Sequence, residues 1–362
     1  MSKKIIVNYD NSPCYQIVIE EDYSNFEKAV LNINGFKMSK VCIVTDSNVA
    51  KLYLDEMIKN AKKCFEQVFS FIIPAGESNK NLGEIQKLYE FLIINHFDRQ
   101  DSLMALGGGV VGDMTGYAAA TYLRGINFIQ VPTTLLSQVD SSIGGKTGVD
   151  FNQYKNMVGA FHMPKLVYIN TSTLKTLPES QFQCGMGEVI KHGLIRNASY
   201  YKWLKENVNH ILTLDNEYLE EMIYESCLIK KDVVEKDPKE KSIRAYLNFG
   251  HTLGHAIEKL SDFKLYHGQC VAIGMVCASY LSKKLGYIND EEHQDIVDTI
   301  KLYGLPTTVE NMKAEDILKA SKSDKKMVGN KVKFTVLKSI GEAISYTDFT
   351  DEDLLGAIEQ VL

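Results

Sequence analysis

Ser102-Leu-Met-Ala-Leu106-Gly107-Gly-Gly109-Val-Val-Gly112-Asp113 passes from a short apolar run into glycines that fit G-x-G-x-x-G, and a helical pattern continues through residues 114–122. Glycines at a strand-to-helix junction let a pyrophosphate approach the backbone N–H groups at the positive end of the helix. A structural glycine turn would leave the same pattern. The standard dinucleotide fold has its glycines after the first strand and an acidic residue about twenty positions later. This stretch has neither feature. A nucleotide site and a structural turn therefore remain alternatives here.

Further strand patterns, each ending in polar residues, flank this stretch. Residues 41–45, 68–73 and 128–131 have the apolar, β-branched character of strands, and residues 82–94 have a helical pattern. The polar residues that follow the three strands are, in order, Asp46 and Asn48, Glu77 and Lys80, and Thr133 and Thr134. Strands that alternate with helices predict a parallel sheet, which binds its ligands at the carboxyl ends of the strands.

The second half of the chain has a different, helical texture. Residues 201–212, 217–234 and 291–302 carry long charged and apolar patterns, and the next strand pattern is at residues 333–337. A chain of 362 residues also suits two domains. We therefore predict an α/β Rossmann-like parallel-sheet domain over residues 1–172 and an all-α metal-binding domain over residues 173–362. A site built from both would lie in the cleft between them.

Charge and cysteine usage limit the classes of function. Forty basic against forty-six acidic residues give a net charge of -6, which argues against nucleic-acid or membrane-surface binding. Seven scattered cysteines without a CxxC pair predict reduced thiols. No signal peptide or apolar run near eighteen residues is visible. We expect a cytoplasmic protein.

Three of the eight histidines lie close together in Asn248-Phe-Gly-His251-Thr-Leu-Gly-His255-Ala-Ile-Glu258 and in the following Tyr266-His267-Gly. On a helix, His251 and His255 share one face, although an ordinary histidine pair would do the same. The metalloprotease motif H-E-x-x-H is absent. Glu188, in Gly187-Glu188-Val-Ile-Lys191, lies at an apolar helix start, where a carboxylate calls for a metal or a cation. With His251 and His267 it matches a zinc site with one open position.

A second group of residues is cationic. Val139-Asp140-Ser-Ser-Ile-Gly-Gly-Lys146-Thr147 ends like a phosphate loop, but Asp140 stands where that loop needs glycine, so we reject a Walker motif. The cations that would suit a substrate with both a phosphate and a carboxylate are Lys146, Lys155, Lys191, Lys230, Arg244 and Lys325. Arg244 has the best shape for binding a carboxylate through two hydrogen bonds.

Together these motifs resemble the 3-dehydroquinate synthases of the shikimate pathway. The resemblance runs in order from Asp46 to the lysine pair at 325–326, through Gly107 to Asp113, Tyr122-Leu-Arg124-Gly, Pro132-Thr-Thr134, Val139 to Thr147, Lys155-Asn156, Gly187 to Lys191, Asn248 to Glu258 and His267-Gly. It implies a two-domain homodimer that uses NAD and zinc, for which cobalt can substitute. It also implies conversion of 3-deoxy-D-arabino-heptulosonate 7-phosphate to 3-dehydroquinate and phosphate, through oxidation at C5, phosphate elimination, reduction and ring closure.

The resemblance also implies roles for individual residues. The metal would be held by Glu188, His251 and His267. The phosphate would meet Lys146, Asn156, Asn248, His255 and Lys325 or its neighbour, with Arg124 from the partner subunit. Lys230 and Arg244 would hold the carboxylate, and Asp140 and Lys191 the hydroxyls. NAD would be lined by Asp46, Asn48, Glu77, Lys80, Gly109, Val110, Val111, Gly112, Asp113, Thr133, Thr134, Lys146, Lys155, Thr173, Leu174, Lys175 and Thr176.

Three positions depart from the family pattern, namely Pro238, Ser242 and Gln269, and they affect the loop before Arg244 and the surroundings of His267. The alternatives are another sugar phosphate cyclase, of the 2-deoxy-scyllo-inosose or valiolone synthase type, and a metal-dependent polyol dehydrogenase. A regulatory nucleotide-binding module with structural zinc would need four protein ligands, and only three are evident. Arg244 with Lys230 favours the carboxylated substrate.

Overall fold

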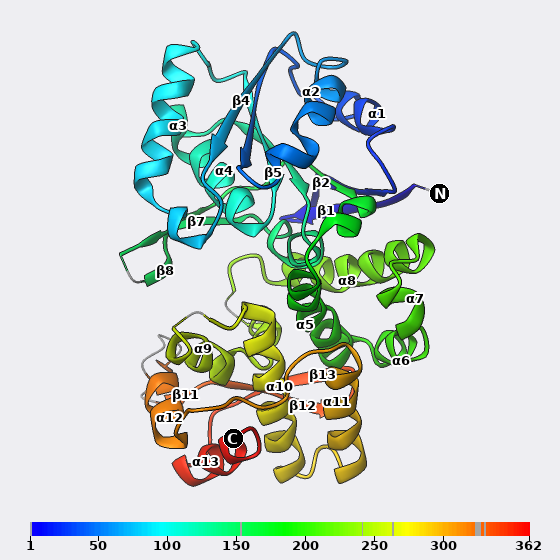
Figure 1. The fold of residues 1–362 in the computed structure, drawn as a ribbon, viewed down its shortest axis with the longest axis vertical. Helices are drawn as coiled ribbons and strands as arrows, with labels where there is room; N and C mark the ends of the chain where they lie inside the picture. Colours follow the sequence, from blue (N-terminus) through cyan, green and yellow to red (C-terminus); the bar gives the residue numbers. More distant parts are fainter. Residues whose placement is uncertain (1, 153, 241, 263, 323–326, 329–330) are drawn as a thin grey trace. The chain divides into compact units, whose positions relative to one another are not determined.

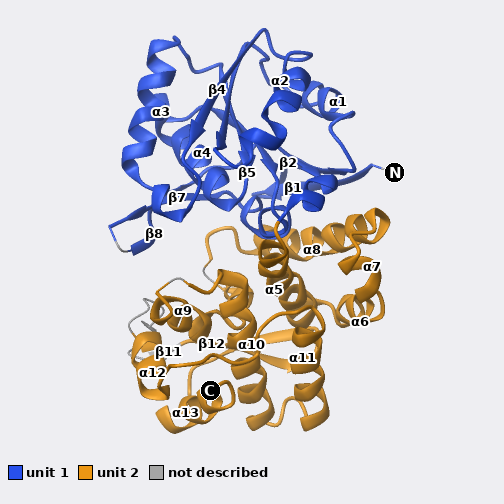
Figure 2. Ribbon diagram, viewed as in Figure 1, with its two compact units in different colours: residues 1–177 blue, residues 178–362 orange. Residues whose placement is uncertain are grey.

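The computed structural model describes residues 2–152, 154–240, 242–262, 264–322, 327–328 and 331–362. The chain forms two compact units, Met1–Leu177 and Pro178–Leu362, which are coloured separately in Figure 2. The boundary predicted after residue 172 falls within the short helix η5 (Thr171–Thr176).

Unit 1 is built on a seven-stranded sheet within the described residues, in the order β1-β2-β9-β6-β5-β3-β4. Its strands are β1 (Lys3–Tyr9), β2 (Ser12–Glu20), β3 (Lys40–Asp46), β4 (Gln67–Ile73), β5 (Ser102–Gly107), β6 (Asn127–Pro132) and β9 (Leu166–Asn170). The β1–β2 pair is antiparallel, and the other pairs are parallel, which confirms the predicted sheet. The strand order reverses between β3 and β5, and ligands of such sheets bind at this point of reversal.

Helices cover both faces of the sheet. Neighbouring residues of a strand point to opposite faces, and in the central strands both sets of residues are apolar. In β3, Val41 and Ile43 pack in one apolar cluster with Phe26 and Met57, whereas Cys42 and Val44 pack in the other. The helices concerned are α1 (Phe26–Leu31) and α2 (Asp55–Ala61) on the first face, and α3 (Leu82–Ile94) and α4 (Gly109–Thr121) on the second. Figure 1 shows these two helical layers around the strands. The central strands are therefore packed against apolar side chains on both faces.

An antiparallel hairpin of β7 (Lys146–Phe151) and β8 (Tyr154–Phe161) also belongs to unit 1. Besides η5, the described short helical segments of the unit are η1 (Ala50–Leu54), η2 (Glu77–Asn79), η3 (Tyr122–Arg124) and η4 (Ser137–Ser141). Lys146 begins a strand and not a helix. The rejection of a Walker motif, in which the lysine opens a helix, is therefore confirmed.

Unit 2 is helical, as predicted, and carries two small antiparallel strand pairs in addition. Its helices are α5 (Glu179–Arg196), α6 (Ala198–Glu206), α7 (Val208–Leu212), α8 (Asn216–Lys236), η6 (Ile243–Asn248), α9 (His251–Leu260), α10 (His267–Lys284), α11 (Asp290–Leu302), α12 (Ala314–Lys322) and α13 (Asp351–Glu359). Its strands are β10 (Met327–Val328), β11 (Lys331–Val332), β12 (Phe334–Ser339) and β13 (Glu342–Tyr346). The helical pattern predicted at residues 201–212 corresponds to α6 and α7, which meet at Asn207, where a φ of -114° and a ψ of 17° depart from helical values.

Glycines bring three helices of unit 2 into very close contact. A Cβ on Gly268 of α10 would lie 1.9 Å from the carbonyl oxygen of Cys184 in α5. A Cβ on Gly274 would lie 1.8 Å from the carbonyl oxygen of Gly250, which precedes α9. Only glycine permits such contacts. These contacts hold α10 directly against α5 on one side and against the start of α9 on the other.

Two expectations about environment can be compared with the structure. All seven cysteines lie in the described residues and are free thiols. Within those residues, no helix combines the length and the apolar character needed to cross a bilayer.

Candidate nucleotide and metal sites

The residues expected to line NAD lie along the carboxyl edge of the unit 1 sheet. Asp46 ends β3, and its Oδ1 accepts hydrogen bonds from the backbone N–H groups of Asn48 at 2.8 Å and Val49 at 3.1 Å. Glu77 and Lys80 follow β4, and the glycine run follows β5. Because β4, β3 and β5 are neighbours in the sheet, these three groups lie beside the point where strand order reverses.

The glycine run allows α4 to pack closely on β6, and it also leaves the start of α4 able to bind an anion. A Cβ on Gly112 would lie 2.8 Å from Oε1 of Gln130, so Gly112 allows close packing of α4 on β6. α4 begins at Gly109, and no side chain caps it. The first N–H groups of a helix have no partner within it and can bind an anion.

Lys80 joins two sets of residues that the sequence had suggested separately. It is only 4% exposed, and its Nζ donates to Oδ2 of Asp113 at 2.7 Å and to Oδ1 of Asn156 at 2.6 Å. Burial alone would lower the pKa of Lys80, but Asp113 and then Glu77 raise it. The structure therefore places the expected phosphate ligand Asn156 directly beside the expected NAD residues Lys80 and Asp113.

The remaining NAD candidates follow β6 and β9. The backbone N–H of Thr133 donates to the carbonyl of Gly107 at 3.0 Å, and Thr134 bonds to Ser137. Thr173 is buried and accepts a hydrogen bond from Nε2 of Gln138 at 3.0 Å. Leu174 is buried in η5, Lys175 is exposed 3.9 Å from Glu21, and Thr176 contacts the hydroxyl of Tyr53. This part of the expected site thus mixes core residues with surface residues.

The other candidates on unit 1 lie on the short helices η3 and η4 and on the β7–β8 hairpin. Asp140 is in η4, Lys146 starts β7, and Nζ of Lys155 lies 4.0 Å from Oε1 of Glu77. Arg124 has a φ of 69°, directly after Leu123 with a φ of 50°. Two successive non-glycine residues with positive φ are costly and typically mark functional segments.

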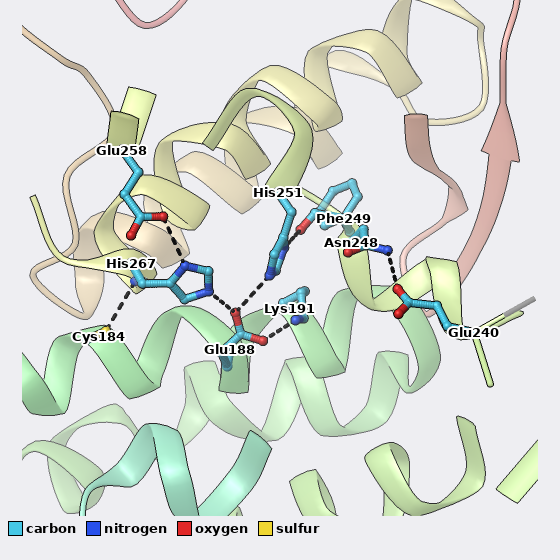
Figure 3. Close-up of polar contacts among 10 residues, drawn as sticks. Cys184, Glu188, Lys191, Glu240, Asn248, Phe249, His251, Glu258 and His267 are labelled. Atoms are coloured by element: carbon cyan, nitrogen blue, oxygen red, sulfur yellow. Dashed lines mark hydrogen bonds and ion pairs between the residues drawn. The ribbon is translucent and has the colours of Figure 1, made fainter. Parts of the chain in front are cut away.

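The expected metal ligands converge in unit 2. Oε1 of Glu188 lies 3.5 Å from Nε2 of His251 and 3.6 Å from Nε2 of His267. This oxygen is buried and accepts no hydrogen bond from the described residues. Two ligand atoms of a tetrahedral zinc ion, each at 2.0–2.1 Å, are about 3.3 Å apart. The spacing between the carboxylate oxygen and each imidazole nitrogen is therefore compatible with a shared metal ion. Figure 3 shows the two imidazoles beside the Glu188 carboxylate.

The far nitrogens of both imidazoles are held by other groups. Nδ1 of His251 lies 3.2 Å from the carbonyl oxygen of Phe249, and Nδ1 of His267 lies 3.4 Å from Oε2 of Glu258. If each Nδ1 carries the proton, each Nε2 is available to a metal. Burial alone would lower the pKa of His267, but Glu188 and Glu258 raise it to about 9.

Lys191 balances the charge of the buried carboxylate. It is 1% exposed, one helical turn after Glu188, and its Nζ contacts Oε2 of that residue. Burial would raise the pKa of Glu188, whereas Lys191, followed by His267, holds it well below its usual range. Glu188 is therefore ionised and has one oxygen directed at the imidazoles.

The expected substrate residues of unit 2 lie on η6, α8 and α9. Lys230 and Arg244 are buried, and Nη1 of Arg244 donates to the carbonyl of Pro238 at 2.7 Å. Nδ2 of Asn248 donates to Oε1 of Glu240 at 3.3 Å. A ring nitrogen of His255 lies within 4.8 Å of ring nitrogens of His251 and His267. Lys325, also expected to bind phosphate, lies outside the described residues.

Sequence reasoning missed two contacts of these sites. It did not connect Glu258 with His267. It also did not join Lys80 to Asn156. Both contacts link segments whose pairing depends on the tertiary fold, and only the periodicity of α9 gave a signal for the first.

Comparisons with known proteins cover both units. Residues 70–184 match the family model described as 3-dehydroquinate synthase N-terminal, and residues 185–327 match 3-dehydroquinate synthase C-terminal. The chain is 47% identical over 343 residues to the 3-dehydroquinate synthase of Acetivibrio thermocellus, with 94% of each chain covered. It is 42% identical to that of Ruminiclostridium cellulolyticum, again with 94% of each covered.

Solved structures show the same fold at lower identity. A 2-deoxy-scyllo-inosose synthase in complex with carbaglucose-6-phosphate, NAD+ and Co2+ has a TM-score of 0.89 at 24% identity, with all of both chains covered. The 2-epi-5-epi-valiolone synthase of Streptomyces hygroscopicus, with NAD+ and Zn2+ bound, has a TM-score of 0.87 at 23% identity and 98% coverage of each chain.

Proposed function

Because the chain belongs to the 3-dehydroquinate synthase family, we propose that it is a carbon–oxygen lyase that converts 3-deoxy-D-arabino-heptulosonate 7-phosphate to 3-dehydroquinate and phosphate. The observation that carries this proposal is the buried oxygen of Glu188, 3.5 and 3.6 Å from the Nε2 atoms of His251 and His267. This donor set leaves a coordination position for a substrate oxygen, as catalytic zinc sites do.

Two bound groups would supply the hydride transfer and the stabilisation of negative charge. When bound, NAD accepts and returns a hydride, and zinc, or cobalt in its place, stabilises negative charge on the reacting oxygen. Glu188, His251 and His267 would hold the metal. The carboxyl edge of the sheet, from Asp46 to the amino-terminal end of α4, would hold NAD. That NAD and Co2+ or Zn2+ are bound by cyclases of the same fold supports this assignment.

The other side chains would hold the two anionic ends of the substrate. Arg244 and Lys230 would bind the carboxylate, and Asn156, Asn248, His255, Lys146 and Lys325 would bind the phosphate. Asp140 and Lys191 would bind hydroxyls. His255 is close to the metal ligands, so the same end of α9 would contribute to holding both the phosphate and the metal. We also propose a homodimer in which Arg124 reaches the partner's substrate.

The test is an assay with the heptulosonate phosphate and a small, substoichiometric amount of NAD+. Each turnover should return NAD to its oxidised form, so we expect many phosphates and an equal number of 3-dehydroquinate molecules per NAD. NADH formed in a one-to-one ratio with oxidised product would instead indicate a dehydrogenase. A metal-free sample should be inactive and should regain turnover with zinc or cobalt, and full activity without metal would contradict the proposal.

A further inference from the structure

Glu258 has no role in the chemistry described above, yet it is almost completely buried beside the metal ligands. It follows His251 and His255 at the i+7 and i+3 positions of α9, so all three share one face of the helix. Its side chain is 9% exposed. A buried carboxylate is strongly disfavoured unless it is paired, and Oε2 lies 3.4 Å from Nδ1 of His267, as Figure 3 shows.

The helix amino termini beside the metal ligands add positive charge to the site. His251 is the first residue of α9, and His267 is the first residue of α10. Each helix amino terminus carries roughly half a positive charge, which disfavours a divalent cation beside it. Glu188 supplies one negative charge, but the buried ammonium of Lys191 contacts its second oxygen. A second carboxylate beside the ligands would offset this positive charge and strengthen the attraction for a cation.

The two imidazole ligands are also held differently. His251 faces a neutral backbone carbonyl through Nδ1, at 3.2 Å, whereas His267 faces a carboxylate. A carboxylate that accepts the Nδ1 proton fixes the orientation of the ring and makes Nε2 a stronger ligand. Glu258 can thus act on the metal through His267 without touching it.

We propose that Glu258 is a positioning residue that orients His267 and supplies the second negative charge of the metal centre. This inference rests on the metal-binding part of the proposed function. Glu188 would then bind the metal directly, and Glu258 would act on it through His267. Lys191 would partly neutralise the charge of Glu188.

The test compares two substitutions by zinc affinity, measured by chelator competition on metal-free protein without NAD or substrate. Glu258→Gln keeps the shape and an oxygen that accepts from Nδ1 but removes the charge, and Glu258→Ala removes both. We expect the dissociation constant of Zn2+ to rise roughly 10- to 100-fold in Glu258→Gln and further in Glu258→Ala.

Asp215→Asn is the matched control. Oδ2 of Asp215 lies 3.3 Å from Nδ1 of His210 at an exposed position, and asparagine still caps α8. Zinc affinity should not change in this variant. Wild-type affinity in Glu258→Gln would overturn the proposal, and this nearly isosteric variant decides the matter even if Glu258→Ala does not fold. Inactivity of zinc-loaded wild-type protein would contradict the proposed function instead, while leaving these affinities interpretable.

Discussion

Arg244 is the residue that we propose to distinguish a carboxylated substrate from a sugar phosphate without a carboxylate. Its guanidinium is held by the carbonyl of Pro238, and its backbone N–H donates to Oδ2 of Asp237 at 3.1 Å. Arg244→Lys keeps the charge but loses the planar pair of donors. A charged hydrogen bond contributes about 1.5–3 kcal/mol, so substrate affinity should fall roughly 10- to 100-fold.

The affinity for NAD should change little in Arg244→Lys, because Arg244 lies outside the expected nucleotide residues. Arg196→Lys provides the control, since Arg196 makes two hydrogen bonds to Asp232 on the surface of the same unit. Steady-state kinetics and NAD titration would measure both effects. Equal losses for NAD and substrate would count against a carboxylate-binding role.

His162 should make the stability of the chain depend on pH. Burial, partly offset by a 2.8 Å hydrogen bond to the carbonyl of Ile126, lowers its pKa below the usual 6.5. The unfolded chain therefore binds more protons below pH 6.5, and the free energy of unfolding falls as pH drops toward the folded-state pKa. His162→Gln should flatten the decline between pH 7 and 5 in denaturant titrations.

The variant should retain part of this slope, because partial burial also lowers the pKa of His293. An unchanged slope in His162→Gln would show that His162 binds its proton as readily in the folded protein as in the unfolded chain.

At the scale of elements, the glycine contacts between α5, α9 and α10 control the metal site. Gly268→Ala would place a methyl group 1.9 Å from the carbonyl oxygen of Cys184 and push α10 away from α5. His267 is the preceding residue, so we expect both a lower melting temperature and weaker zinc binding. Overpacking of this kind typically costs about 1–3 kcal/mol.

Gly356→Ala is the control for this substitution. Gly356 lies inside α13, and an added Cβ would meet only the hydroxyl of Tyr280, at an ordinary 3.8 Å. Alanine is the better helix former by about 0.5–1 kcal/mol. Thermal unfolding should therefore show slight stabilisation here, with zinc affinity unchanged. Wild-type behaviour of Gly268→Ala would mean that α5 and α10 can separate without disturbing His267.

Local patterns in the sequence predicted most elements but not their long-range partners. The helix at residues 82–94 was predicted with the bounds that α3 has, because its apolar period is uninterrupted. The β7–β8 hairpin was not predicted, since β8 is mostly exposed and lacks a buried face. The pairing of β2 with β9 also joins distant segments, and no local propensity encodes such a contact.

At the scale of the whole chain, the change in texture from alternating strands to helices was enough to predict two architectures. The convergence of Glu188, His251 and His267 was inferred from chemistry and family resemblance, because 63 residues separate the first two. Glu258 and the Lys80–Asn156 contact escaped prediction for a physical reason. Buried charges acquire their partners only when packing excludes water, and a sequence does not display that exclusion.

The two units should respond separately to the two proposed cofactors. A ligand that binds only the folded state stabilises it by about 2.7 kcal/mol at 100 times its dissociation constant. Zinc should therefore slow amide hydrogen exchange in α5, α9 and α10, and NAD should slow it at the carboxyl ends of β3, β4 and β5. Exchange measured by mass spectrometry on metal-free, zinc-loaded and NAD-loaded protein would resolve these segments. Glu188→Gln should abolish the zinc effect and keep the NAD effect, because only the first depends on the buried carboxylate. Zinc protection that survives in Glu188→Gln would place the metal elsewhere in the chain.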